Sequence, residues 1–287
     1  MEHDGPDVGG DHWWKLHGAG NDFLVRAISS EHFPIGAKEA MLLADRHYGI
    51  GADGVIEVVL SEGQIPKMIL RNADGSLAEM SGNGLRCLGH FLSRQEYVSD
   101  ATFEVMTGAG PRLYRRLSSS PLSRTMVGET MMGEGSLQGS VTFASGEVGT
   151  LVDMGNPHLV LVEGKGHALP RDFDVESEGR RLSADFPRGI NIEWIWPEDD
   201  GSYSLVVYER GVGPTLACGT GTCASFLALS AVSALPDELV VHNPGGALSV
   251  RRDDGVLWLG GTSVMVGEFF ASHDDASNDD GMAHGTH

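Results

Sequence analysis

The chain has 287 residues and a formal net charge of −20 at pH 7. This length fits two domains, each large enough to bury a core of its own. The negative charge disfavours nucleic acid and anionic membranes as partners, and the sequence has no run of about 18 apolar residues that would span a bilayer. Residues 1–12 form an acidic tail without the pattern of a secretory or mitochondrial signal, so we expect a cytoplasmic protein.

Segments rich in β-branched and aromatic residues predict short strands along most of the chain. In chain order these strands are 55–60, 67–71, 102–106, 151–154, 159–163, 190–196, 204–208, 239–242, 248–251, 256–259 and 264–270. Helices are predicted at Ala37–His47, after Ser81 and after Cys218. The last helix is apolar nearly all round, so we expect strands to enclose it.

Two further segments are predicted to lie outside these elements. Residues 117–139 carry clusters of Ser, Pro and Gly, and they are predicted to contain the boundary between two halves. Residues 272–287 are acidic and lack apolar periodicity, which predicts a disordered tail.

The sequence repeats several motifs at a nearly constant interval. Three pairs recur in the same order, 137 or 135 positions apart: Ser81 with Cys218, Asn72 with Glu209, and Gly20–Phe23 with Gly155–His158. Such a repeat predicts that the chain is two copies of one fold unit. Two copies placed face to face would put one side chain on each side of a substrate, as proton exchange at a stereocentre requires.

Two glycine turns follow the repeated nucleophile-type residues. Gly82-Asn83-Gly84 comes after Ser81, and Gly219-Thr220-Gly221 comes after Cys218. Each turn would present free backbone N–H groups at a helix start, where the dipole favours a carboxylate. A single turn of this kind is more often only structural, but the duplication favours a binding site. A thiol at a helix start is expected to have a lowered pKa, which makes Cys218 the predicted base.

Five further runs complete a pattern that resembles diaminopimelate epimerases: Lys15–Phe23, Asp45–Gly54, Asn72–Ser76, Gly155–His158 and Glu209–Gly213. Together with the glycine turns they extend from about residue 13 to 270. The resemblance implies an α/β (α+β) fold with two pseudo-symmetric domains, each a β-barrel-like mixed sheet around a central helix. The active site would lie in the cleft between them. The implied domains are 13–124 with a returning strand 264–271, and 125–263.

The resemblance also implies an activity. The family interconverts LL- and meso-diaminopimelate without a cofactor or a metal, in lysine and peptidoglycan precursor biosynthesis, and often as a homodimer. Its substrate-binding side chains match Asn21, Asn72, Asn156, Asn191, Glu209 and Arg210, with backbone from Gly82, Asn83, Gly219 and Thr220. Glu209 can take the reacting ammonium, and Arg210 can pair with the distal carboxylate in bidentate fashion.

Some of these assignments stay open between a ligand and a structural role. Asn21 and Asn72 lie in turns, where asparagine is commonly structural, whereas the strand position of Asn191 favours a ligand. His158 is either catalytic or packed under the site, and packing is favoured because the sequence shows no carboxylate partner for it. Cys87 and Cys223 lie inside the predicted helices and are interpreted as core residues.

Ser81 is a departure from the family, which has a catalytic cysteine at this position. An alcohol does not ionise near neutral pH without an adjacent base, and no histidine or lysine neighbours Ser81. We expect Cys218 and Ser81 to be the catalytic pair, with the serine returning a proton as a weak acid or through water. Three interpretations are open: a diaminopimelate epimerase in a natural or engineered Ser/Cys form, another cofactor-independent amino-acid racemase or epimerase, and a diamino-acid-binding protein without turnover.

Overall fold

The computed structural model describes residues 12–119, 123–163 and 173–271. Within them, eight strands of the first half pair into a closed ring in the order β1-β2-β3-β4-β6-β7-β8-β17. Their bounds are β1 (His12–Gly18), β2 (Asn21–Ser29), β3 (Gly54–Leu60), β4 (Lys67–Asn72), β6 (Thr102–Thr107), β7 (Gly110–Ser119), β8 (Thr125–Gly133) and β17 (Val256–Phe270), with β5 (Leu77–Ala78) on the edge of β4.

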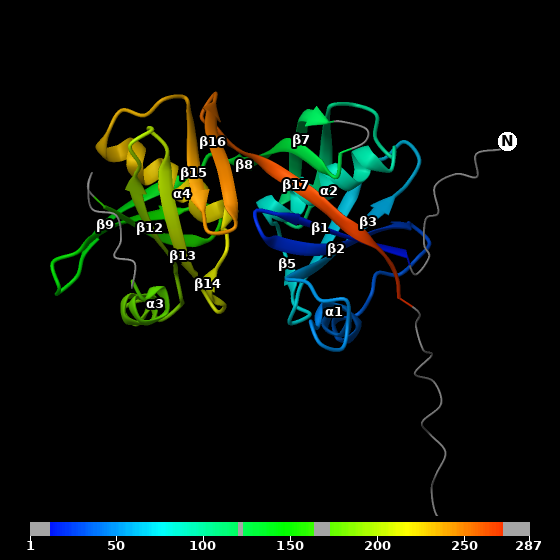
Figure 1. Cartoon of the computed structure of the whole chain (residues 1–287), viewed down its shortest axis with the longest axis horizontal. Coiled ribbons are helices and arrows are strands. Elements are labelled where there is room, and N and C mark those ends of the chain that lie inside the picture. Colours follow the sequence, from blue (N-terminus) through cyan, green and yellow to red (C-terminus); the bar gives the residue numbers. More distant parts are fainter. Residues whose placement is uncertain (1–11, 120–122, 164–172, 272–287) are drawn as a thin grey trace, which may run out of the picture.

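The second half repeats this arrangement. Its strands pair in the order β9-β10-β11-β12-β13-β15-β16-β17, and β17 pairs with β8, which leads along the chain into β9. Their bounds are β9 (Ser136–Thr142), β10 (Val148–Asp153), β11 (Pro157–Val162), β12 (Asn191–Pro197), β13 (Tyr203–Glu209), β14 (Gly213–Thr215), β15 (Glu238–Asn243) and β16 (Gly246–Asp253). The long strands β8 and β17 run through both halves and join them side by side (Figure 1).

One helix occupies the centre of each half. Helix α2 (Gly82–Arg94) is buried from Gly82 to Leu92 and packs with the apolar side chains of the first ring. Helix α4 (Gly219–Val232) is buried almost throughout and packs inside the second ring. Figure 1 shows α2 and α4 within their respective halves. The prediction that strands enclose the apolar helix α4 is confirmed, because a helix surrounded by strands has no solvent-facing side.

Two outer helices connect parallel strands at matching places in the halves. Helix α1 (Ala37–Ala44) lies between β2 and β3 along the chain, and α3 (Val175–Ser183) lies between β11 and β12. Each packs on the outside of its ring, α1 with Leu24 and Val55 and α3 with Ile192 and Trp194. The pseudo-symmetry predicted from the repeated motifs is confirmed by this shared strand–helix–strand unit.

The structure confirms the predicted fold class and corrects several details. The first helix ends at Ala44 and not at His47, because the Asp45 carboxylate accepts the N–H groups of His47 and Tyr48 and turns the chain. The segment 117–139, predicted to contain the boundary between the halves, includes strand β8 and part of β9, and its role as a boundary stays a prediction. The elements that were not predicted are helix α3 and strands β1, β2, β5, β7, β8, β9 and β14.

Residues 1–11 and the predicted tail 272–287 lie outside the described residues. None of the helices in the described part of the chain has the length and apolar character needed to cross a bilayer. The domain bounds stay a prediction, since β8 and β17 pair with strands of both halves.

Candidate active site

The two glycine turns meet above Leu259 in the shared strand β17. A Cβ atom added to Gly219 would lie 3.7 Å from Gly82 Cα and 3.9 Å from Asn83 N. A Cβ atom added to either Gly82 or Gly219 would lie only 2.8 Å from the same Leu259 Cδ2 atom. A side chain at either position would therefore have to displace the Leu259 side chain, which favours glycine in both turns.

Ser81 and Cys218 have the same structural role in the two halves. Both are helix N-cap residues with extended backbone, at φ −139° and ψ 124° for Ser81 and φ −119° and ψ 115° for Cys218. Ser81 Oγ accepts the N–H of Gly84 at 3.0 Å, and Cys218 Sγ accepts the N–H of Gly221 at 3.3 Å. The nucleophile-type side chains therefore stand at two helix starts that face one another.

Four backbone N–H groups of the turns remain free to bind an anion. The amides of Gly82, Asn83, Gly219 and Thr220 have no acceptor among the described residues, whereas those of Gly84 and Gly221 are taken by the two cap side chains. The first N–H groups of a helix carry its positive dipole end. The arrangement has the donors that a carboxylate requires.

The electrostatic environment of Cys218 differs from the sequence-based expectation. Burial, followed by the charges of Glu209 and Glu193, raises the pKa of the Cys218 thiol well above its ordinary value. The Thr220 hydroxyl and the Gly221 N–H act in the opposite direction without offsetting these effects. The predicted lowering of this pKa is therefore wrong, because desolvation and two carboxylates outweigh the helix start.

Glu209 lies at the end of β13, next to Cys218. Its Oε1 accepts a hydrogen bond of 2.5 Å from Thr215 Oγ1. Burial and the charge of Glu193 raise the pKa of Glu209, while hydrogen bonds from Thr215 and Cys218 act to lower it. A cationic group beside this carboxylate would be well compensated, as predicted for the reacting ammonium of a substrate.

Glu193 is a site residue that the sequence analysis missed. Its Oε1 lies 2.7 Å from His158 Nδ1, and neither side chain is exposed to solvent. The other ring nitrogen of His158, Nε2, lies 3.0 Å from Asn156 Oδ1. Glu193 Oε1 also lies directly below Gly221, which has no room for a side chain there. One feature of the sequence could have revealed Glu193: it forms a polar pair with Asn191 on one face of the otherwise apolar strand β12.

The predicted asparagines lie around this centre, and most of their amides are already bonded. Asn21 Nδ2 donates to Asp53 Oδ2 at 2.9 Å, and Asn72 Nδ2 donates to Ser76 Oγ at 3.0 Å. The backbone N–H of Ala73, next to Asn72, donates to the Asp53 carbonyl at 3.0 Å. This hydrogen bond links the segment of Asn72 to the segment of Asp53, which also holds Asn21. Both residues therefore have the structural role that the sequence left open, and a ligand role for them stays a prediction.

Asn191 connects Pro157 with the predicted site residue Arg210. Its Nδ2 donates to the Pro157 carbonyl at 3.1 Å, and its Oδ1 accepts the backbone N–H of Arg210 at 2.9 Å. This contact holds the chain at Arg210, whose side chain is exposed and forms no ion pair with any described residue. The guanidinium is therefore free to reach an added carboxylate.

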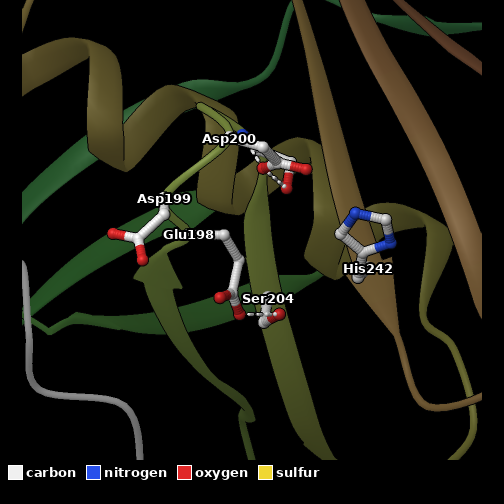
Figure 2. A pocket seen from close by; sticks show the side chains of 6 residues that line it. Glu198, Asp199, Asp200, Ser204 and His242 are labelled. Atoms are coloured by element: carbon white, nitrogen blue, oxygen red, sulfur yellow. Dashed lines mark hydrogen bonds between the residues drawn. The ribbon is translucent and has the colours of Figure 1, made fainter.

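A surface pocket lies elsewhere in the second half, lined by residues of the β12–β13 connection, β13 and β15. Figure 2 shows the side chains that line it, with those of Glu198, Asp199, Asp200, Ser204 and His242 labelled. Glu198 accepts a hydrogen bond from Ser204, and Asp200 accepts one from Ser202, each at 2.5 Å. Among the residues that the structure describes, no group of three or more His, Cys, Asp or Glu side chains is arranged to hold a metal ion.

Comparisons with known proteins agree with this geometry. The family model described as diaminopimelate epimerase matches residues 13–134 and 150–268. A diaminopimelate epimerase of Clostridium perfringens is 32% identical over 267 residues, which covers 88% of this chain and 96% of that protein. One of Mycobacterium sp. (strain KMS) is 35% identical over 296 residues, covering 90% and 98% respectively.

Solved structures show the same fold at much lower identity. The crystal structure of a phenazine biosynthesis protein of the PhzF family from Bacillus anthracis has a TM-score of 0.70 to this chain at 13% identity, covering 90% of this chain and 97% of the other. That likeness concerns the fold alone. The sequence matches extend over both halves and both glycine turns, and the chain belongs to the diaminopimelate epimerase family.

Proposed function

We propose that this protein interconverts LL- and meso-diaminopimelate by removing and returning the proton at one Cα, as an isomerase of lysine and peptidoglycan precursor biosynthesis. The observation that carries the proposal is the meeting of two glycine turns, each capped by a side chain able to transfer a proton, Ser81 on one and Cys218 on the other. Such a pair can act on opposite faces of one carbon atom. We further propose that these side chains do so without a cofactor.

The substrate carboxylate would bind the free N–H groups of Gly82, Asn83, Gly219 and Thr220. The ammonium at the reacting carbon would lie beside Glu209, and Arg210 would bind the carboxylate at the distal end. Asn21, Asn72, Asn156 and Asn191 would surround the substrate or hold the turns that do. These placements are supported by the contacts of the residues and by their match to the family's motifs.

Substrate binding would also prepare the base. In the free protein the charges of Glu209 and Glu193 raise the pKa of Cys218. An ammonium beside Glu209 neutralises one of these charges, and the pKa of Cys218 then falls toward the range in which a thiolate forms. Cys218 withdraws the proton from one face, and Ser81 returns one to the other face as a weak acid or through water.

The resemblance also supports a proposal for the compartment, the oligomeric state and the domain bounds of the protein. We propose a cytoplasmic homodimer with domains at 13–124 plus 264–271 and at 125–263. Cys218 is only 6% exposed, so the two domains would have to separate for the substrate to enter.

One experiment tests the proposed function. The purified protein is incubated with LL-diaminopimelate in D₂O, and NMR follows both deuteration at Cα and the appearance of meso product. Formation of meso product supports the proposal. Exchange or racemisation only with other amino acids would replace it with a different racemase, and binding without any exchange would replace it with a diamino-acid-binding protein.

A further inference from the structure

Arg86 is a fully buried arginine that forms no ion pair with any described residue. It lies in the first turns of α2, and none of its surface is exposed. Its Nη2 donates to Asn83 Oδ1 at 2.6 Å, whereas Nε and Nη1 have no hydrogen-bond acceptor among the described residues. It lies against the backbone of β1 and β17, since Cβ atoms added to Gly18 and Gly261 would be 3.2 Å and 3.5 Å from its guanidinium nitrogens.

The absence of a partner is unusual for such a group. Burial lowers the pKa of Arg86 to about 10, which still leaves it protonated at neutral pH. A buried charge with unsatisfied donors is costly, and proteins normally pair it. Arg26, another buried arginine of the same half, donates from Nε and Nη2 to Glu57 at 3.0 Å and 2.7 Å. The unpaired state of Arg86 therefore calls for a reason other than stability.

The one side-chain hydrogen bond that Arg86 forms within the described residues leads to the candidate active site. Asn83, its acceptor, is 2% exposed and lies in the first glycine turn. Because Arg86 holds Asn83 Oδ1, the amide nitrogen Nδ2 points the other way, toward Ala217 O at 3.5 Å and Asn21 Oδ1 at 3.4 Å. Ala217 directly precedes Cys218, so this amide connects the Ser81 turn to the Cys218 turn.

We propose that Arg86 is a positioning residue for the epimerisation: it fixes the Asn83 amide, which in turn holds the Ser81 and Cys218 turns in register. The effect of Arg86 on epimerisation rests on the proposed function. Its role in holding the two turns in register does not depend on that function.

The first test compares Arg86→Met, Arg86→Lys and the control Arg94→Met. Arg94 lies on the same helix but is exposed, away from both turns. We expect Arg86→Met to lower kcat for α-proton exchange by about ten- to a hundredfold, because a small displacement of reacting groups costs rate more than affinity. Arg86→Lys keeps the charge and one donor, so it should recover part of kcat. The control should keep the parent values.

A double-mutant cycle shows whether Arg86 acts through Asn83. Asn83→Ala should lower kcat by itself, and Arg86→Met should then add little, because the contact has already been lost. Full additivity of the two effects would overturn the proposal. So would an Arg86→Met variant that unfolds at a lower temperature but keeps the parent kcat and KM in its folded fraction, since that is what a purely structural role predicts.

The second test needs no substrate. In a Ser81→Cys background, diamide can accept the two electrons and two protons released when the introduced thiol and Cys218 form a disulfide, and mass spectrometry measures its rate of formation. We expect Arg86→Met to slow this cross-link at least about tenfold and Arg94→Met to leave it unchanged. An unchanged rate in Arg86→Met would overturn the positioning role. If the parent protein fails to act on diaminopimelate, the proposed function fails, and the cross-link rates alone decide the role of Arg86.

Discussion

His158 and Glu193 form a fully buried pair beneath the Cys218 turn, with Nδ1 and Oε1 2.7 Å apart. Glu193 Oε2 has no hydrogen-bond partner among the described residues, and its carboxylate is one of the two charges that raise the pKa of Cys218. The charge of Glu193 therefore links the strand core of the second half to the thiol.

The first prediction concerns this link. Glu193→Gln keeps a hydrogen-bonding group beside His158 and removes one negative charge, so the pKa of Cys218 should fall. Alkylation of Cys218 by a small reagent, followed by mass spectrometry, should then begin at a lower pH than in the parent. Glu198→Gln, a carboxylate in the pocket of Figure 2, serves as the control. An unchanged pH profile in Glu193→Gln would show that this carboxylate does not act on the thiol.

The second prediction concerns the base itself. Cys218→Ala should abolish α-proton exchange and leave binding of diaminopimelate largely intact, because the carboxylate is held by backbone N–H groups. Exchange is followed by NMR in D₂O and binding by calorimetry. Cys223→Ala is the matched control, since this cysteine is fully buried in the core around α4 and should not affect exchange. Exchange at the parent rate in Cys218→Ala would exclude this thiol as the base.

The third prediction concerns recognition of the distal end. Arg210→Lys should weaken substrate binding by about ten- to a hundredfold, because an ammonium cannot reproduce the bidentate contact of the guanidinium. Steady-state kinetics on LL-diaminopimelate give KM and kcat, and Arg180→Lys on the outer helix α3 is the control. If Arg210→Lys keeps both constants, this arginine is structural.

The fourth prediction concerns Ser81. Ser81→Cys should raise kcat for epimerisation by about two orders of magnitude or more, because a thiol is a much better proton donor and acceptor than an alcohol. In the parent, α-deuteration should outpace inversion, since Cys218 can remove and return a proton on one face. Parallel measurement of deuteration and meso product checks both statements. Equal rates in the parent, with no gain in Ser81→Cys, would mean that the serine is already competent.

The fifth prediction concerns stability in acid. Burial acts to raise the pKa of Asp22, but the hydrogen bonds and charges of Arg46 and Lys15 outweigh it and lower this pKa from 3.8 to about 2. A lowered pKa stabilises the folded state above the unfolded value, and this stabilisation is lost as the pH falls from 3.8 through 2. Asp22→Asn should therefore lower the free energy of unfolding by about 2 kcal/mol at neutral pH.

Denaturant unfolding between pH 2 and pH 7 checks this statement. The difference between Asp22→Asn and the parent should shrink as the pH falls below 3.8 and be small by pH 2. Asp100→Asn, at an exposed position, should follow the parent throughout. A difference that stays constant with pH would show that Asp22 contributes through packing and not through its charge.

The local features of this protein could be read from its sequence. The glycine turns after Ser81 and Cys218 depend on residues within a few positions, and both become helix starts, as predicted. That the side chains of Ser81 and Cys218 cap these helices is seen only in the structure. The repeated motifs indicated two similar halves, and the two rings with their central helices confirm them. Cys87 and Cys223 lie in the core as interpreted.

Only the tertiary structure decided the electrostatics and the contacts between distant segments. Glu193 reaches His158 because β11 and β12 pair in parallel, and no local pattern states this register. Arg86 is buried because the first ring closes around its helix, although its sequence neighbours would allow an exposed arginine. The pKa of Cys218 was predicted with the wrong direction because a helix start is a local property, whereas desolvation sums over every group that packs around the thiol.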